Sequence, residues 1–150
     1  MKKGLILISI LTLGFGFYAK AQYIGTGDLP ADITQDFSAK YPNLTKVEWE
    51  KDGKRFKATF NVEQFAHQVV YDQNGKLISQ EFGLPVSNLP ADVFGGLKKN
   101  FPDLKVAEAD QVEEKGKVSY KLSLTDDNNA TEKVLMAADG RVIRTIIDQE

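Results

Sequence analysis

The feature that most constrains this chain is an internal repeat. Residues 29–44 begin LPAD and end YPNL, and residues 89–104, sixty positions later, begin LPAD and end FPDL. A pattern that recurs at a fixed interval indicates one supersecondary unit used twice. We therefore expect two related units, residues 29–82 and residues 89–150, joined by a connector at residues 83–88. Because so short a connector cannot separate independent domains, the two units should share a core or a sheet.

Each unit opens with a helical pattern. Apolar residues recur every four positions in both units, which predicts a single apolar stripe along each helix. The stripe residues are Leu29, Ile33, Phe37 and Tyr41 in the first unit and Leu89, Val93, Leu97 and Phe101 in the second. Asp28 is the expected N-cap of the first helix, with Pro30 in its first turn. Pro42 predicts the end of that helix near Tyr41, because proline disfavours the helical conformation of the residue before it.

Two glycines interrupt the second helical pattern. Gly95 and Gly96 lie inside it, where each costs about 1 kcal/mol relative to alanine. One interpretation is a weak helix that tertiary packing holds in place. The other is a close approach of this helix to the first helix or to the sheet, where a Cβ atom would clash.

After each helix the pattern changes to alternating apolar and polar residues, which is typical of half-buried strands. The expected strands cover residues 46–50, 55–62, 65–71 and 77–82 in the first unit and residues 104–112, 118–124, 134–136 and 142–147 in the second. Hairpin turns are expected at Gly53, Gly75, Gly116 and Gly140. A helix followed by four sequential strands is most simply an antiparallel meander with the helix across one face, so the fold class is α+β.

The N-terminal stretch, residues 1–21, has the pattern of a signal peptide. Lysines at the start precede an apolar run, and the small residues Ala19 and Ala21 predict cleavage before Gln22. The alternative, an uncleaved anchor, would need about 20 apolar residues. We expect a periplasmic or secreted mature chain that begins at Gln22 and has no membrane span. We assign no regular structure to its lead-in, residues 22–28.

Composition narrows the possible partners and chemistry. The formal charge is −2, and removal of the three lysines within residues 1–21 makes it about −5. An acidic mature chain argues against nucleic acid as a partner. The chain has no cysteine, which excludes disulfides, zinc–thiolate sites and a thiol nucleophile. Packing of its 42% apolar residues must therefore hold the fold together.

This layout resembles a known family of exported bacterial proteins. A signal sequence followed by two helix-plus-four-strand units, each with LP at the helix start, YP or FP at its end and NG or DG before the last strand, is similar to the β-lactamase-inhibitor-like, PepSY-like family. The resemblance covers residues 29–147. It implies a single PepSY-like domain, in which both units contribute to one long antiparallel sheet with the helices on one face. It also implies an extracytoplasmic binding role without catalysis, because the named relatives are inhibitors and inhibitory propeptide-type modules.

The chain departs from β-lactamase inhibitory proteins of this layout in two respects. Those proteins carry disulfides and bind through an open sheet face rich in aromatic residues, whereas this chain has no cysteine and its strand aromatics alternate toward the expected helix side. These aromatic residues are Trp49, Phe56, Phe60, Tyr71 and Tyr120. The opposite alternation is polar and charged, so we expect an open polar sheet face.

Two binding hypotheses follow. In the first, the open face and the hairpin tips bind an extracytoplasmic protein or a cell-envelope component. Arg55 and Lys57 on one strand, and Lys117 and Lys121 on another, are the expected contacts, because alternation places each pair on one face. In the second, the chain inhibits a secreted hydrolase, a peptidase or a β-lactamase, by inserting a hairpin turn, for which Asp52 is the candidate residue.

The sequence offers little catalytic equipment. Its one histidine, His67, lies on the core-side alternation and is expected to be partly buried with one hydrogen-bond partner rather than a metal ligand. Residues 72–75 and 126–129 are expected to be a hairpin turn and a solvated loop tip rather than cation sites. We expect no catalytic residue, no cofactor and no metal site, so a small hydrolase is the least favoured hypothesis.

Overall fold

The computed structural model describes residues 22–146. The expected signal peptide, residues 1–21, lies outside the described residues, and so does Ile147 at the end of the last expected strand. Between residues 22 and 146, neither helix has the length and hydrophobicity that crossing a bilayer would require.

Each unit contains one helix followed by four strands, as expected. The elements of the first unit are α1 (Ala31–Lys40), β2 (Val47–Asp52), β3 (Arg55–Val62), β4 (Phe65–Asp72) and β5 (Leu77–Gly83). The elements of the second unit are α2 (Ala91–Asn100), β6 (Lys105–Glu114), β7 (Lys117–Thr125), β8 (Thr131–Ala137) and β9 (Val142–Ile146). Positive φ angles at Gly53, Gly75, Gly116 and Gly140 turn the chain at the expected hairpins.

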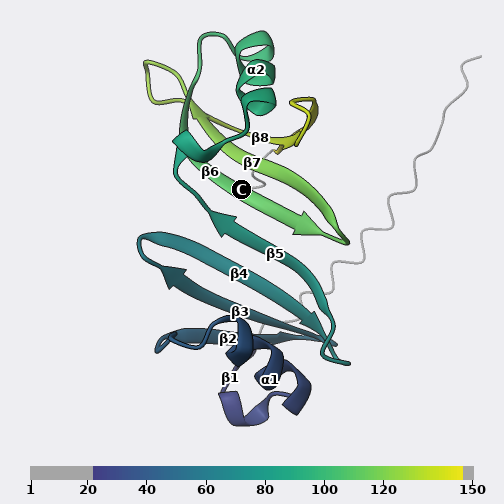
Figure 1. The fold of residues 1–150 in the computed structure, drawn as a ribbon. Helices are drawn as coiled ribbons and strands as arrows, with labels where there is room; N and C mark the ends of the chain where they lie inside the picture. Colours follow the sequence, from purple (N-terminus) through teal and green to yellow (C-terminus); the bar gives the residue numbers. More distant parts are fainter. Residues whose placement is uncertain (1–21, 147–150) are drawn as a thin grey trace, which may run out of the picture.

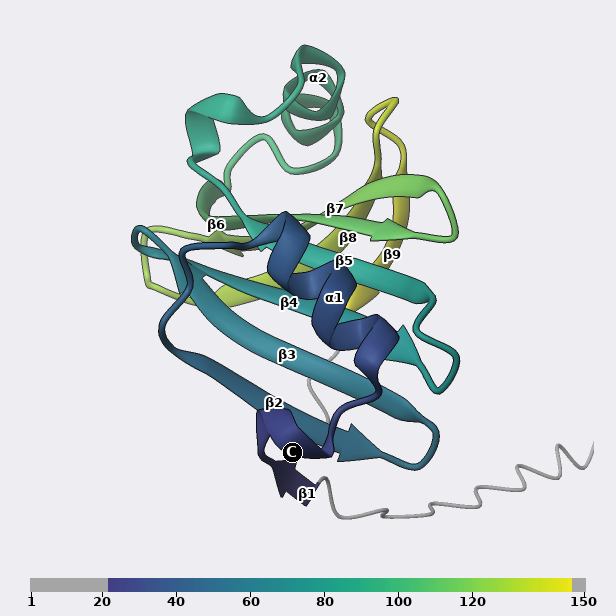
Figure 2. The same ribbon diagram turned by 60° about the horizontal axis from the view of Figure 1, so that its bottom comes forward.

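All the described strands form one antiparallel sheet in sequence order (Figure 1). Its edge strands are β1 (Gln22–Ile24) and β9, and β5 pairs with β6 to join the two units. The turned view shows α1 lying across β3 and β4 (Figure 2). The register places Phe60, under α1, and Tyr120, under α2, on the same face of the sheet. The expected long antiparallel sheet with its helices on one face is therefore confirmed.

Each helix covers its own hydrophobic cluster. Ile33 and Phe37 of α1 pack on the aromatic residues of β2 to β4, and Val93 and Leu97 of α2 pack on β6 to β8. Between the clusters the helix side of the sheet is polar, where Gln80 donates a hydrogen bond of 2.8 Å to the carboxylate of Glu113. The two units thus share a sheet while their buried clusters stay separate.

The lead-in is structured, so the expectation of no regular structure at residues 22–28 is wrong. Strand β1 pairs with Trp49–Lys51 of β2, and a 3₁₀ turn, η1 (Thr26–Asp28), follows it. Ile24 packs against the cluster under α1. A strand of three residues carries too little periodicity to be recognised from the sequence, and its pairing depends on β2, which is distant along the chain.

The expected N-cap of α1 is also wrong. The helix begins at Ala31, its N-cap position is Pro30, and no side chain caps it. Asp28 does not reach the helix because Leu29 keeps an extended backbone, with φ of −83° and ψ of 145°. Its carboxylate instead accepts a hydrogen bond of 3.2 Å from the backbone N–H of Gly25 and closes the 3₁₀ turn.

The glycine pair in α2 occupies two different environments. A Cβ atom on Gly96 would lie 1.9 Å from the carbonyl oxygen of Gly140, in the turn between β8 and β9. A Cβ atom on Gly95 would have no neighbour within 4 Å among the residues that the structure describes. Gly96 therefore marks a close approach of the kind proposed from the sequence, but to a hairpin turn of the sheet rather than to α1.

Candidate functional site: the open sheet face

The sheet face opposite the helices is open. The aromatic residues expected on the helix side are buried, and the most exposed of them, Tyr120, is 7% exposed. One row of paired residues crosses the other face from the edge strand β1 to β7. Its members are Tyr23, Glu50, Lys57, Val70, Ser79, Glu114 and Lys117. The expected contact residues Lys57 and Lys117 therefore lie on the same face and in the same row.

On β3, the two expected cations differ in their surroundings. The ammonium group of Lys57 lies 2.6 Å from the carboxylate of Glu50 on β2, so its charge is paired. Arg55 is exposed at the start of the strand, opposite Asp52 in the register. Within residues 22–146 its guanidinium has no hydrogen bond or ion pair. Of the two, Arg55 is the one whose charge is available to a partner.

The same division holds on β7. The Lys121 ammonium contacts the carboxylate of Glu81 on β5 and lies 3.7 Å from that of Asp110 on β6. Burial raises the pKa of Asp110, an effect that the adjacent Lys121 charge opposes. Lys117 is exposed and stands opposite Glu114 in the register, and it has no ion pair in the described chain. Lys121 therefore links the two units, while Lys117 remains free to bind.

The expected residues do not converge on one site. Strands β3 and β7 are four strand spacings apart in the sheet, a separation of roughly 19 Å. Asp52 is exposed at the β2–β3 hairpin, beside Arg55 and remote from β7. The structure thus places these residues in two groups on one face, one in each unit.

A hollow of about 840 Å³ lies on the open face of the second unit. Its aliphatic lining includes Val112, Leu135, Ala137, Ile143 and Ile146. Its charged lining consists of Glu81, Glu114, Lys115, Lys117, Lys121, Arg141 and Arg144. The open face is therefore mainly polar over the first unit, apart from Tyr23 and Val70, and partly apolar over the second.

The sequence reasoning missed three features of this face. Leu135 lies between Val134 and Met136, both fully buried, and an unbroken apolar run obscures which side each residue takes. Ile143 is 52% exposed, next to a register shift between β8 and β9 that alternation alone does not reveal. Tyr23 is 70% exposed and belongs to the unrecognised strand β1.

The lone histidine is a core-side residue, as expected, but its hydrogen bonding differs. The His67 ring lies between those of Phe60, with centroids 5.6 Å apart, and Phe82, at 4.9 Å. Its buried Nδ1 has no hydrogen-bond partner in the part of the chain that the structure describes, and burial lowers the pKa of His67. Among residues 22–146, no group of three or more His, Cys, Asp and Glu side chains could hold a metal ion.

The pKa of His67 leads to a prediction about pH. The pKa of His67 in the folded chain lies below the ordinary value of 6.5. As the pH falls below that value, His67 therefore binds more protons in the unfolded chain than in the folded chain. The free energy of unfolding should therefore decrease as the pH is lowered from 7 toward the folded-state pKa of His67. His67→Phe, which keeps a ring between Phe60 and Phe82, should show a smaller decrease. Urea denaturation at a series of pH values measures both slopes, and equal slopes would contradict the prediction.

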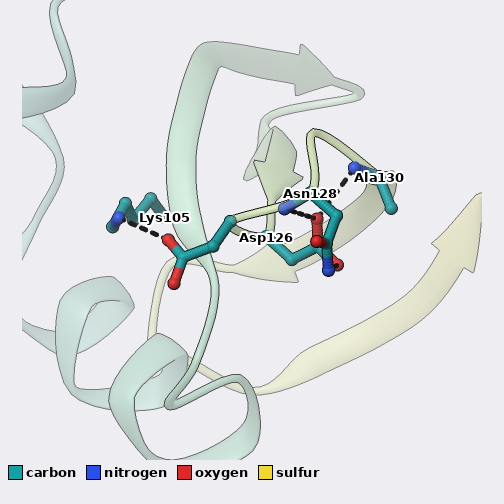
Figure 3. Close-up of polar contacts among 5 residues, drawn as sticks. Lys105, Asp126, Asn128 and Ala130 are labelled. Atoms are coloured by element: carbon teal, nitrogen blue, oxygen red, sulfur yellow. Dashed lines mark hydrogen bonds and ion pairs between the residues drawn. The ribbon is translucent and has the colours of Figure 1, made fainter.

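The acidic turns bind their own backbone. One carboxylate oxygen of Asp126 accepts hydrogen bonds of 2.8 Å from the N–H groups of Asn128 and Ala130, and Lys105 pairs with Asp127 at 2.8 Å (Figure 3). The Ala130 hydrogen bond is the largest cause of the lowered pKa of Asp126. Asp72 similarly accepts from two N–H groups within its own hairpin turn. These carboxylates stabilise turns, in agreement with the expected turn and loop tip.

Comparison with solved structures shows the same fold in proteins from Bacteroides species. A DUF2874 family protein from Bacteroides ovatus is 19% identical, with 79% of this chain and 86% of that chain covered and a TM-score of 0.66. A BLIP-like protein from Bacteroides fragilis is 17% identical, with coverages of 79% and 85% and a TM-score of 0.63. A structure from Bacteroides eggerthii described as "putative periplasmic proteins" is 18% identical, with coverages of 79% and 88% and a TM-score of 0.68.

Comparison of sequences identifies the family. No curated protein matches the chain. The sequence profile described as "Putative beta-lactamase-inhibitor-like, PepSY-like" matches it twice, over residues 17–79 and 79–144. These two matches follow the internal repeat and together cover most of the chain. The chain therefore belongs to the PepSY-like, β-lactamase-inhibitor-like family.

Proposed function

We propose that the chain is a non-catalytic exported binding module that uses its open sheet face. The observation that carries this proposal is the hollow over β6 to β9, where aliphatic side chains are exposed on a face that neither helix covers. Exposed apolar patches rimmed by polar residues mark interaction sites in soluble proteins. A face of this kind contributes apolar contact at its centre and charged contacts at its rim.

The partner that we propose is an extracytoplasmic protein or a cell-envelope component. The signal-peptide pattern of residues 1–21 supports export, and the similar protein from Bacteroides eggerthii is described as periplasmic. Arg55 and Tyr23 give the first unit an exposed cation and an exposed aromatic ring on the same face. Tyrosine and arginine are enriched among the residues that dominate binding energy at protein interfaces.

Inhibition of a secreted hydrolase is the second candidate. It is favoured by the tight hairpin between β2 and β3, where Gly53 turns the chain with a φ of 57°. Asp52, the residue before this glycine, is exposed at the tip. It also accords with the name of the similar BLIP-like protein from Bacteroides fragilis. An inhibition assay with purified mature chain and Asp52→Ala tests this candidate directly, since loss of inhibition in the variant is its expected result.

Site-specific photo-crosslinking tests the main proposal. A benzophenone side chain would replace Thr59 or Ser119 on the open face, and Gln35 or Lys99 on the exposed sides of the helices as matched controls. In exported fractions of the source cells, we expect crosslinked products from the two sheet positions and none from the helix positions. Equal crosslinking at all four positions, or crosslinking from the helices alone, would refute use of the open face.

A further inference from the structure

We propose that the hollow over β6 to β9 binds an extended protein segment in which an aliphatic side chain lies between two carboxylates. This inference rests on the proposed function and adds the chemistry of the partner. It follows from the balance of charge around the hollow, the spacing of its unpaired cations and the aliphatic residues between them.

The charged rim is positive in a chain that is acidic as a whole. Five cationic and two anionic side chains line the hollow, whereas the formal charge of the chain is −2. Three of the cations have partners. These contacts join Lys121 to Glu81, Lys115 to Glu114 at 4.0 Å and Arg141 to Asp139 at 2.8 Å. Lys117 and Arg144 have no ion-pair partner among residues 22–146, so a bound carboxylate would complement each of them.

The two unpaired cations are too far apart for one compact anion. Arg144 stands two strands from β7, in register with Leu135 and Lys121, which is about 10 Å across the sheet. Lys117 precedes Lys121 by four residues, which is about 13 Å along the strand. The Cα atoms of Lys117 and Arg144 are therefore roughly 16 Å apart. Side chains on a strand stand roughly perpendicular to the sheet, so a single phosphate or carboxylate would contact both only if the two cations leaned toward each other along the sheet. A polypeptide with two acidic residues can meet both in the upright orientation.

The spacing also defines the register of the partner. In an extended segment, residues separated by four positions project to the same side and lie about 13 Å apart. Lysine and arginine side chains are long enough to cover the remaining few ångströms. The residue midway between the two acids projects to the same side and would lie over the aliphatic floor of the hollow, where Ala137 and Leu135 are half-buried and Ile143 is exposed. The segment we infer therefore has acid, aliphatic and acid at alternate positions.

A labelled synthetic peptide tests this inference. The probe carries aspartate, leucine and glutamate at alternate positions, and its control has asparagine and glutamine in place of the acids. Fluorescence anisotropy should show the acidic probe binding the mature chain about tenfold more tightly than the amide control. The difference should shrink as salt is added, because screening weakens exposed charge pairs. Equal binding of the two peptides, or no binding of the acidic probe, would overturn the inference.

Matched variants locate the binding. Lys117→Glu combined with Arg144→Glu should weaken probe binding by about tenfold or more. Lys98→Glu combined with Lys99→Glu makes the same charge change on α2, on the helix side of the sheet, and should leave binding unchanged. Both pairs are exposed, so the melting temperatures should stay close to wild type. Equal loss in the two double variants would mean that net charge, rather than the hollow, binds the peptide.

Crosslinking and sedimentation separate this inference from the proposed function. The benzophenone at position 119 can crosslink a partner equally well with and without the Lys117→Glu and Arg144→Glu changes. In that case the open face binds a partner, but not through an acidic segment. If Ser119 yields no product in either protein, the proposed function fails as well. A wild-type dimer that dissociates in the variant would make a second copy the occupant and overturn the inference. The inference would also be overturned if the wild-type chain bound anionic vesicles, the double variant did not, and the acidic peptide failed to compete with the vesicles.

Discussion

Gly96→Ala is expected to destabilise the protein by about 3 kcal/mol. The new Cβ atom would lie 1.9 Å from the carbonyl oxygen of Gly140 and 2.8 Å from the Cε atom of Met136. The first neighbour is backbone in a hairpin turn, so α2 would have to move away from the sheet. That movement would separate Val93 and Leu97 from the cluster beneath them. Urea denaturation followed by circular dichroism measures the loss.

Gly95→Ala is the matched control for this prediction. The same methyl group is added one position earlier in the same helix, where it meets nothing within 4 Å. We expect this variant to be more stable than wild type by up to about 1 kcal/mol, because alanine favours a helix interior over glycine. If the two variants had the same stability, the close packing of α2 on the β8–β9 turn would be wrong.

The first unit fills the position of Gly96 differently. Asp36 stands sixty positions before Gly96, and its carboxylate accepts hydrogen bonds of 2.7 Å from the Tyr71 hydroxyl and 2.8 Å from the Lys40 ammonium. The Lys40 hydrogen bond is the largest cause of the lowered pKa of Asp36. Burial, followed by the hydrogen bond to Asp36, raises the pKa of Tyr71. At this helix position the first unit thus uses side-chain hydrogen bonds, whereas the second uses direct contact with the backbone of a hairpin turn.

Phe37→Ala is expected to destabilise the first unit by about 4 kcal/mol. The Phe37 ring is 7% exposed and lies among three aromatic rings, with centroid separations of 5.0 Å to Tyr41, 5.0 Å to Trp49 and 5.4 Å to Phe60. Removing it leaves a cavity that those rings, fixed on a helix end and two strands, cannot close. Trp49 is the only tryptophan of the chain, so its fluorescence during urea denaturation reports on this cluster.

Phe37→Leu provides the control for the cavity. Leucine keeps an apolar side chain between α1 and the sheet and should lose about 1.5 kcal/mol. The prediction would fail if Phe37→Ala lowered the free energy of unfolding no more than Phe37→Leu does, because the aromatic cluster would then have collapsed around the missing ring.

The fold was predictable to the extent that it depends on neighbouring residues. The four-residue spacing that includes Ile33 and Phe37 indicates a helix because such positions share one face of a helix. Alternation of apolar and polar residues along β3 and β7 indicates strands because alternate residues of a strand lie on the same face of a sheet. Glycines such as Gly53 mark the turns. The failure at β1 arose because that strand depends on pairing with β2, which is distant along the chain. The failure at Asp28 has a local cause, because its carboxylate closes the η1 turn on Gly25 instead of capping the helix.

The candidate site was predictable only in part. Alternation assigns Arg55, Lys57, Lys117 and Lys121 to one face, but it does not reveal which of these charges are already paired. Lys121 meets Glu81 across forty positions of sequence, and only the pairing of β5 with β6 and β7 brings the two together. The hollow was missed because its floor draws on β6, β8 and β9, and no single strand displays it.

The sequence by itself determined the order of the two helices and of β2 to β9, the positions of the hairpin turns and the inward faces of most of these strands. These properties depend on residues within a turn or two of one another, where helical and extended periodicities differ. The tertiary structure alone decided that β5 joins β6, that β1 extends the sheet, that α2 requires glycine at position 96 and that Lys117 and Arg144 have no ion-pair partner within residues 22–146. Each of these depends on the distance between atoms far apart in the chain, which becomes defined only when the sheet is assembled.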